Sequence, residues 1–351
     1  MIIDEHLFLA LIGLIGGIGL GLSARIGRFC TMGAIEDTLY GEGTGRLRMW
    51  GTAIVVAIFG TFYLRSTGTF DGMEMPYLST PLNIVVAAVG GILFGYGMAL
   101  TGTCGFGALA RIGGGDFRGT IVALMMGVSA YFVFAGPGAY LRELITNPAP
   151  PSLDYAGGYA DWLARYTGLS PIVIGYGIAA LLAIVVLKGW DLRKDKLRLV
   201  WGIVVGLSVT LGFAGTAYIA QTGFSNPAIE SHSFAAPIGE TMLYLMQGSA
   251  RPLTFGIGSV TGVILGAAIG SLVKGEFRWE GCEDPRELRR QTFGAVFMGV
   301  GAVIAGGCTI GQGVSGISTL AYAAPFAMLG IFAGAAFGLR QLIEGFNAIP
   351  D

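Results

Sequence analysis

The sequence predicts an all-α membrane protein, with about nine transmembrane helices and four re-entrant or short half-helices in two inverted, pseudo-symmetric halves. The first observation behind this fold class is composition. The 351 residues are 53% hydrophobic and 12% charged and include 60 glycines, whereas soluble domains carry about 25% charged residues and about 7% glycine. The mean hydropathy of +0.69 also indicates a membrane protein. The net charge of −1 offers no basic footprint for nucleic acid.

The second observation is a series of apolar runs, each long enough to cross a hydrocarbon core of about 30 Å. The runs cover residues 7–24, 47–65, 82–102, 118–137, 170–189, 197–219, 253–273, 291–307 and 321–342. A Pro-rich loop is expected over 138–169, and an amphipathic surface helix over 236–248.

Positive charge sets the expected orientation. If the nine runs alternate in direction, all but four of the 21 Lys and Arg residues fall on one side, the exceptions being Arg65, Arg142, Arg165 and Arg251. Because Lys and Arg concentrate in cytoplasmic loops, the N-terminus is predicted outside the cell and the C-terminus in the cytoplasm.

The third observation is an internal repeat. "FGYGMALTGTCGFG" (94–107) aligns without gaps on "MGVGAVIAGGCTIG" (298–311), so that Cys104 falls on Cys308. Runs one to four then match runs six to nine. The fifth run lies between the two copies, and this one additional crossing turns the second copy upside down in the membrane. The sequence thus predicts a first repeat over 1–137, a connecting loop and linker helix over 138–196, and a second repeat over 197–351. Inverted repeats commonly place the substrate site between the halves.

Glycine-rich stretches after four of the runs predict the half-helices, over residues 28–40, 103–113, 224–231 and 308–318. Their expected starts are Cys30, Cys104, Ser225 and Cys308, with Asn226 as a suitable cap. Free N–H groups and the dipole at a helix start can hold an anion without a Lys or Arg. The nine runs carry no charge well inside them.

Residues around these starts are candidates to support an anion. They are Gly105, Gly307, Thr309, Gln312, Ser225 and Asn226. Thr309 and Gln312 could equally serve as helix caps. Four cysteines without a CxxC pair or a nearby histidine predict no metal site, and no cofactor is expected. Cys282, in "RWEGCEDPRELRR", is expected to be an ordinary solvent-facing thiol.

Three stretches resemble the YeeE/YedE family of bacterial inner-membrane proteins: "RFCTMGAIEDTLYG", "FGYGMALTGTCGFGALARIGGG" and "MGVGAVIAGGCTIGQGVSG". The resemblance implies nine transmembrane helices, four half-helices and thiosulfate uptake. It also implies that Cys30, Cys104 and Cys308 pass the anion along by S–H···S hydrogen bonds. Some members of the family work beside a small TusA-like sulfur-carrier protein, so the resemblance also implies such a partner in the cytoplasm.

Three alternatives remain at this stage. The substrate could be another sulfur or selenium species, as for other members of the family. The chain could be a membrane sulfurtransferase or thiol oxidoreductase, but reactive thiols need a lowered pKa and a basic or resolving partner, for which the sequence gives no sign. A channel for neutral solutes is the third. We therefore expect a transporter that is not an enzyme.

Overall fold

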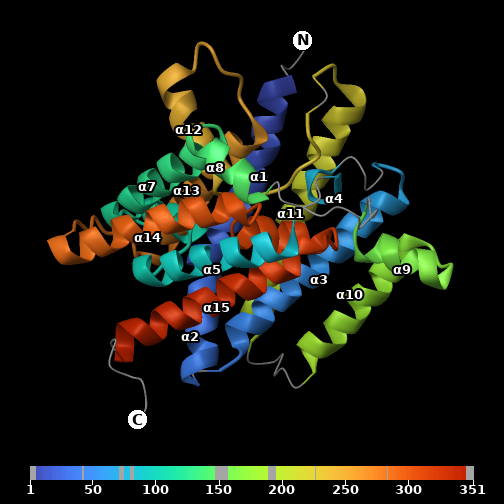
Figure 1. Cartoon of the computed structure of the whole chain (residues 1–351), viewed down its shortest axis with the longest axis horizontal. Helices are drawn as coiled ribbons and strands as arrows, with labels where there is room; N and C mark the ends of the chain where they lie inside the picture. The colour runs from blue at the N-terminus through green and yellow to red at the C-terminus, as the bar shows by residue number, and fades with distance from the viewer. Residues whose placement is uncertain are drawn as a thin grey trace.

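The fold is helical throughout the part of the chain that the structure describes. The computed structural model describes residues 5–41, 43–70, 75–79, 83–146, 157–188, 195–225, 227–282 and 284–344. Within these ranges, the single pairing of extended chain is a bridge between Asp116 and Glu280. The all-α class is confirmed, and Figure 1 shows the helices packed around one another as a bundle.

Long helices lie on all of the predicted apolar runs. They are α1 (Glu5–Arg25), α3 (Gly45–Ser66), α5 (Ile84–Thr101), α7 (Phe117–Phe134), α10 (Pro171–Leu187), α11 (Lys196–Thr222), α13 (Phe255–Lys274), α14 (Pro285–Ile304) and α15 (Ala323–Glu344). By length and hydropathy, the described residues contain seven helices able to cross a membrane, or eight if the pair α9 and α10, bent by 115°, is one span. The helix α14 is not among the seven, and its first turns are charged. Nine spans therefore stay a prediction.

Short helices follow four of the long ones. They are α2 (Thr31–Tyr40), α6 (Gly105–Gly113), α12 (Ala236–Gln247) and the π-helix η2 (Gly311–Gly316), which continues a helical turn that begins at Thr309. The helix α12 packs on α7 and α13 and matches the amphipathic helix expected over 236–248. A one-turn helix α4 (Pro76–Ser79) also lies in the fold.

Two sequence predictions are wrong. The stretch expected to be a half-helix over 224–231 contains no helix in its described residues, and the next helix is α12. Hydrogen bonds to α11 hold it instead: the Thr216 hydroxyl donates to the Glu230 carbonyl oxygen at 2.8 Å, and Ser231 Oγ donates to the Val209 carbonyl oxygen at 2.7 Å. The expected loop over 138–169 contains α8 (Gly138–Thr146) and α9 (Tyr159–Thr167), while 147–156 lie outside the described residues.

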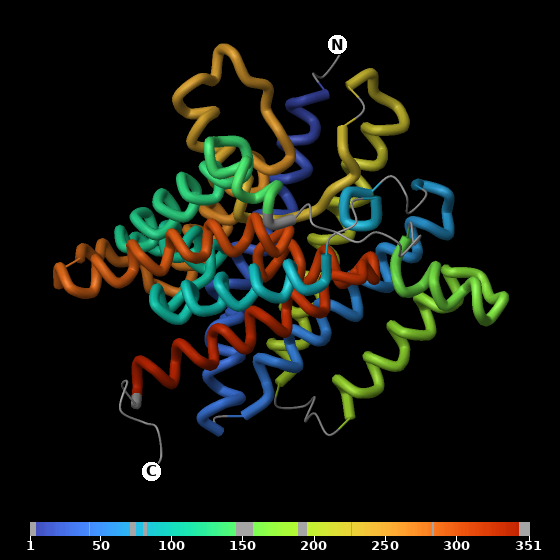
Figure 2. The backbone as a smooth tube through the Cα atoms, in the orientation of Figure 1, coloured from blue at the N-terminus to red at the C-terminus, as the bar shows by residue number. Residues whose placement is uncertain are grey.

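Glycine allows the closest helix contacts. The α1–α13 and α5–α15 pairs make the most extensive contacts in the bundle, and Figures 1 and 2 show α5 and α15 side by side. A Cβ at Gly17 of α1 would fall on the Ser259 carbonyl oxygen, and one at Gly262 of α13 on the Leu14 carbonyl oxygen. Such reciprocal contact of backbones is how helices associate in lipid, where small residues take the place of a hydrophobic driving force.

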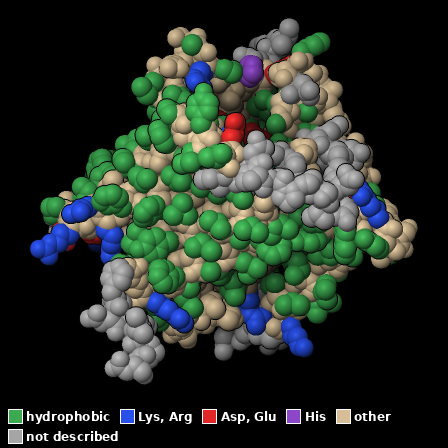
Figure 3. Space-filling view, viewed as in Figure 1, with side chains coloured by type: hydrophobic (Ala, Val, Ile, Leu, Met, Phe, Trp, Pro, Cys, Tyr) green, Lys and Arg blue, Asp and Glu red, His purple; other side chains and the backbone are tan. Residues whose placement is uncertain are grey.

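The two ends of the bundle differ in charge. The helix α1 begins at one end and α15 finishes at the other (Figure 1). Figure 3 shows Lys and Arg side chains mainly along the edges where α2 lies, α14 begins and α15 ends, with a broad hydrophobic band between. Exposed apolar side chains on the long helices include Val85, Val128, Leu181 and Phe337. An apolar girdle of this kind suits a lipid environment.

Substitution at the glycine contact tests the packing. We expect Gly17→Val to lower the free energy of unfolding by about 1–3 kcal/mol, because the added side chain meets backbone that cannot move aside. Gly177→Val is the control, since Gly177 lies in α10 with nothing within 4 Å of a Cβ. Thermal unfolding of both purified variants in detergent measures the difference. Equal midpoints for the two variants would contradict the packing described here.

Candidate functional site

Three cysteines occupy the same structural position, the residue just before a short helix. Cys30 and Cys104 are the N-caps of α2 and α6, both in extended backbone. Their sulfur atoms accept the N–H of the residue three positions on, Gly33 at 3.5 Å and Gly107 at 3.4 Å. This is the hydrogen bond that a Ser, Thr or Asp oxygen usually accepts at a helix start. A sulfur cap accepts more weakly and keeps its own S–H free to donate.

Cys308 repeats the arrangement in the second half of the chain. Its Sγ accepts the N–H of Gly311 at 3.4 Å and also that of Phe234 at 3.3 Å. Gly306 and Gly307, with φ of 72° and 157°, form the turn that returns the chain from the end of α14. Gln312 holds this turn, since its Nε2 donates to the Gly306 carbonyl oxygen at 2.9 Å.

The three thiols, together the thiol cluster (Cys30, Cys104 and Cys308), lie close to one another. Cys104 lies near both Cys30 and Cys308. Cys104 and Cys308 are 1% and 0% exposed, while Cys30 is half-buried. Cys104 and Cys308 belong to the main hydrophobic core, and Cys30 packs against it.

A row of aromatic rings joins the segments that carry the thiols. The Phe106 ring lies 6.4 Å from the ring of Phe29 and 5.4 Å from that of Phe234, centroid to centroid. Phe29 precedes Cys30, Phe106 lies in the first turn after Cys104, and Phe234 donates its N–H to Cys308. The rings therefore fix the relative positions of the three helix starts.

Buried polar atoms beside the thiols lack partners. Within the described part of the chain, Thr31 Oγ1 and Gln312 Oε1 are buried and make no hydrogen bond. Thr31 directly follows Cys30, and Gln312 lies one helical turn after Cys308, while the Thr309 hydroxyl interacts with the Cys104 thiol. Buried polar groups are normally satisfied. The two unpaired oxygens beside the thiol cluster are therefore available to a polar ligand.

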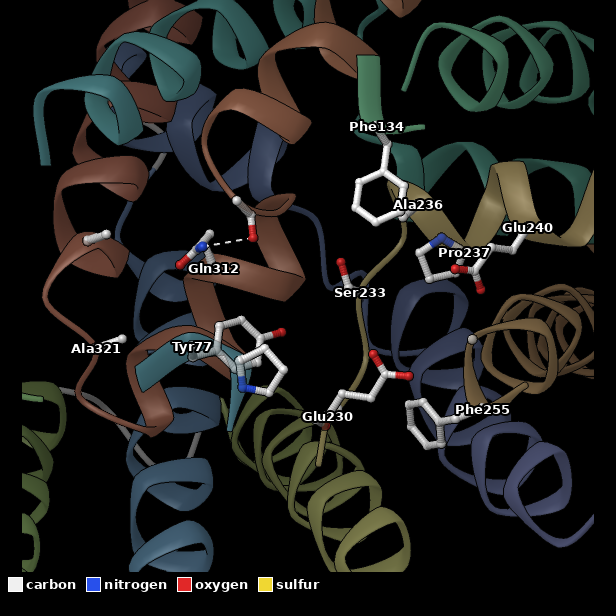
Figure 4. Close-up of a pocket in the computed structure, with 15 residues that line it drawn as sticks. Tyr77, Phe134, Glu230, Ser233, Ala236, Pro237, Glu240, Phe255, Gln312 and Ala321 are labelled. Atoms are coloured by element: carbon white, nitrogen blue, oxygen red, sulfur yellow. Dashed lines mark hydrogen bonds between the residues drawn. The ribbon is translucent and has the colours of Figure 1, made fainter. Parts of the chain in front are cut away.

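A cavity of about 390 Å³ leads toward Cys308. Its lining includes Tyr77, Glu230, Ser233, Glu240 and Gln312, and Figure 4 shows their side chains around it. Ser233 Oγ lies 3.9 Å from Cys308 Sγ, so one wall of the cavity contacts the thiol cluster. At about 30 Å³ per water molecule, the volume suits a small hydrated ion. We call this space the acidic cavity.

The acidic cavity lies toward the end of the bundle where α1 begins. Its lining includes the end of α7 and the starts of α12, α13 and α15, together with residues of α4, of the segment before α12 and of η2. Figure 3 shows acidic side chains in a hollow beside α12, away from the edges where Lys and Arg gather. The cavity and the basic surface are therefore at different ends of the molecule.

The predicted supporting residues divide into two groups. Gly307, Thr309 and Gln312 surround Cys308, and Gly105 starts α6 beside Cys104, where a Cβ would press on Met126 Sδ. Ser225 is not at the site, which corrects its predicted role as a half-helix start. It is exposed, and its hydroxyl donates to Glu5 Oε2 at 2.6 Å. Asn226 lies outside the described residues.

Sequence reasoning did not identify Tyr77, Glu230, Ser233 or Glu240 as site residues. The available signal was the occurrence of Glu230 and Glu240 in the apolar segment that joins α11 to α13. Among the described residues, no group of three His, Cys, Asp or Glu side chains could hold a metal ion. Cys282 is half-buried in the loop between α13 and α14, where its S–H donates to the Asp284 carbonyl oxygen at 3.5 Å.

Thiol accessibility tests this geometry. In four variants that each keep one cysteine, we expect a water-soluble maleimide to modify Cys30 and Cys282 at least about tenfold faster than Cys104 and Cys308, because buried thiols are inert. Mass spectrometry of the purified protein in detergent follows the rates. If Cys308 were modified as fast as Cys282, the burial of the thiol cluster would be wrong.

Two relatives are similar over nearly the whole length. The thiosulfate transporter TsuA of Spirochaeta thermophila is 28% identical over 316 residues, which cover 88% of this chain and 92% of the relative. The thiosulfate transporter TsuA of Escherichia coli K12 is 27% identical over 334 residues, with 86% of each chain covered.

The family follows from a broader comparison. The family model described as sulphur transport matches residues 26–337, a range that contains the thiol cluster, the acidic cavity and most of the bundle. The protein therefore belongs to the sulphur transport (YeeE/YedE) family.

Proposed function

We propose that the protein is an uptake transporter for thiosulfate or a closely related sulfur anion and that the thiol cluster forms its route. The observation that carries the proposal is the presence of three thiols at three short-helix starts, close together and beside unpaired buried oxygens of Thr31 and Gln312. The names of the two TsuA relatives support the substrate class.

Helix starts explain how such a site can hold an anion and still release it. Each helix N-terminus favours a negative charge by about 0.3–2 kcal/mol, far less than a buried cationic side chain would. Conduction needs binding that is weak enough for the ion to leave. The thiol cluster and its three helix starts supply this weak, distributed attraction without a Lys or Arg.

The thiols add selectivity for sulfur. The backbone N–H groups donate to each sulfur cap, so the S–H of Cys30, Cys104 and Cys308 remains available as a weak donor. The terminal sulfur of thiosulfate is a soft, polarizable acceptor, which suits a thiol donor better than a sulfate oxygen does. Transfer of the anion by S–H···S hydrogen bonds from one thiol to the next is the mechanism that we propose.

Two inverted repeats, over 1–137 and 197–351, with 138–196 between them, are part of the proposal. The packing supports it: α1 packs against α13 while α11 packs against α3, and α5 packs against α15 while α14 packs against α7. If each helix of the first half is replaced by its counterpart in the second half, and the reverse, the α1–α13 pair becomes the α11–α3 pair. The α5–α15 pair becomes the α14–α7 pair in the same way. On this basis α12, rather than a helix at Ser225, corresponds to α2, and all nine long helices cross the membrane.

The orientation that we propose places the start of α1 outside the cell and the end of α15 in the cytoplasm of a bacterial inner membrane. The gathering of Lys and Arg where α2 lies and α15 ends supports it, because positive loops stay cytoplasmic. The acidic cavity then faces outward and is the entrance. A small TusA-like sulfur carrier at the basic end is the partner that we propose.

Uptake into proteoliposomes tests the route. We expect Cys30→Ala, Cys104→Ala and Cys308→Ala each to reduce thiosulfate uptake by at least about tenfold, because each removes a donor and a helix cap. Cys282→Ala is the matched control and should keep wild-type uptake, since Cys282 lies in a loop away from the thiol cluster. Gel filtration of each variant checks folding.

Competition in the same assay tests the substrate class. Excess sulfate should leave thiosulfate uptake unchanged, because it has the same charge but no terminal sulfur. Normal uptake by the Cys30, Cys104 and Cys308 triple alanine variant would contradict the thiol route. A persulfide or mixed disulfide formed during turnover would favour a sulfurtransferase instead.

A further inference from the structure

The acidic cavity presents a problem for an anion transporter. Two carboxylates, Glu230 and Glu240, face the entrance to a route for a dianion, as Figure 4 shows. Among the described residues that line the cavity there is no Lys, Arg or His. Two fixed negative charges would repel a divalent anion strongly in a space enclosed by protein, where charges are poorly screened. At least one of these charges must be neutralised before the anion enters.

Glu240 has stabilising partners for its charge. The Thr254 hydroxyl donates to Glu240 Oε2 at 3.3 Å, and the positive charge of Arg251 acts on the same carboxylate. Glu240 lies on α12, beside the start of α13. Burial raises the pKa of its carboxyl group, and the contacts with Thr254 and Arg251 oppose part of that effect.

Glu230 is different. The Thr216 hydroxyl binds both backbone groups of Glu230: it donates to the Glu230 carbonyl oxygen at 2.8 Å and accepts the Glu230 N–H at 3.2 Å. Its carboxyl group makes no hydrogen bond or ion pair with described residues, and it is accessible from the cavity. The charged group that faces it is the Glu240 carboxylate. Glu230 thus has a fixed position, contact with cavity water and nothing to stabilise its charge.

Tyr77 connects Glu230 to the thiol cluster. The Tyr77 side chain, on α4, lies near Glu230, Cys308 and Ser315, and Figure 4 shows it beside Glu230 at the cavity. His232, on the same segment as Glu230, is instead buried and pairs with Ser259 Oγ at 2.6 Å. An anion that moves from the cavity to Cys308 therefore passes Glu230 and Tyr77.

We propose that Glu230 is a proton-dependent charge selector: its carboxyl takes up one proton from water when a divalent sulfur anion enters the acidic cavity, and it excludes the anion when ionised. The inference rests on the proposed function and adds a specificity-determining residue to it. By linkage, a proton that promotes anion binding must itself bind more tightly when the anion is present.

The protonation state of Glu230 fits this role near neutral pH. Although the Glu230 side chain opens to the cavity, it lies deep among protein atoms, and this burial, together with the neighbouring Glu240 carboxylate, raises the pKa of Glu230 to about 7. Below this pH the carboxyl is neutral and the cavity admits a dianion. As the pH rises through 7 the carboxyl ionises, so anion affinity falls.

Titration of the full-length protein in detergent with thiosulfate tests the proposal. Between about pH 6 and 8, the wild-type Kd should weaken with pH, by up to about tenfold per unit above pH 7, as expected for one linked proton. Binding at pH 7.5 in weak buffer should remove protons from solution, which an indicator dye detects. Glu230→Gln, which mimics the neutral carboxyl, should bind with a pH-independent Kd and no proton uptake.

Glu276→Gln is the control, because it makes the same substitution at an exposed residue in the loop after α13. This variant should keep the wild-type dependence of Kd on pH and the wild-type proton uptake. A wild-type slope and proton uptake in Glu230→Gln would overturn the proposal, as would pH-independent binding in the wild type. Both outcomes leave thiosulfate transport standing. Failure of the wild type to bind or transport thiosulfate at any pH would instead overturn the proposed function.

Discussion

The structure depends on one requirement, that the free N–H groups of a helix which starts inside an apolar bundle must be satisfied. Three helices meet this requirement with sulfur, at Cys30, Cys104 and Cys308. A thiol accepts a backbone N–H while its own S–H remains a donor. The same atoms therefore stabilise the fold and, in the function that we propose, provide an electrically neutral place for an anion.

Glycine is what allows these helix starts to meet. Along α1–α13 and α5–α15 the backbones approach until a single methyl group would collide with a carbonyl oxygen, as at Gly17 and Gly262. Tight pairs of long helices leave the short helices to face one another across the core, where Phe29, Phe106 and Phe234 set their spacing. Polar access then comes from the acidic cavity, which contacts Cys308 through Ser233.

Much of this architecture could be predicted from local sequence signals. Apolar runs located the long helices, and Gly-rich stretches next to Cys30, Cys104 and Cys308 located three helix starts. The Ser225 prediction failed because Pro and Asn are local signals for a helix start, whereas hydrogen bonds to Thr216 and Val209 hold the described residues of the segment in a non-helical course. The role of Glu230 was missed for the same reason, since a cavity is created by contacts between distant segments.

The most direct measurement is the position of a bound anion. Crystals soaked with selenosulfate, in which selenium replaces the terminal sulfur, would locate it by anomalous scattering. This account predicts a selenium peak within hydrogen-bonding reach of a sulfur of the thiol cluster. A fully occupied site confined to the basic surface, with no selenium at the three helix starts, would contradict it.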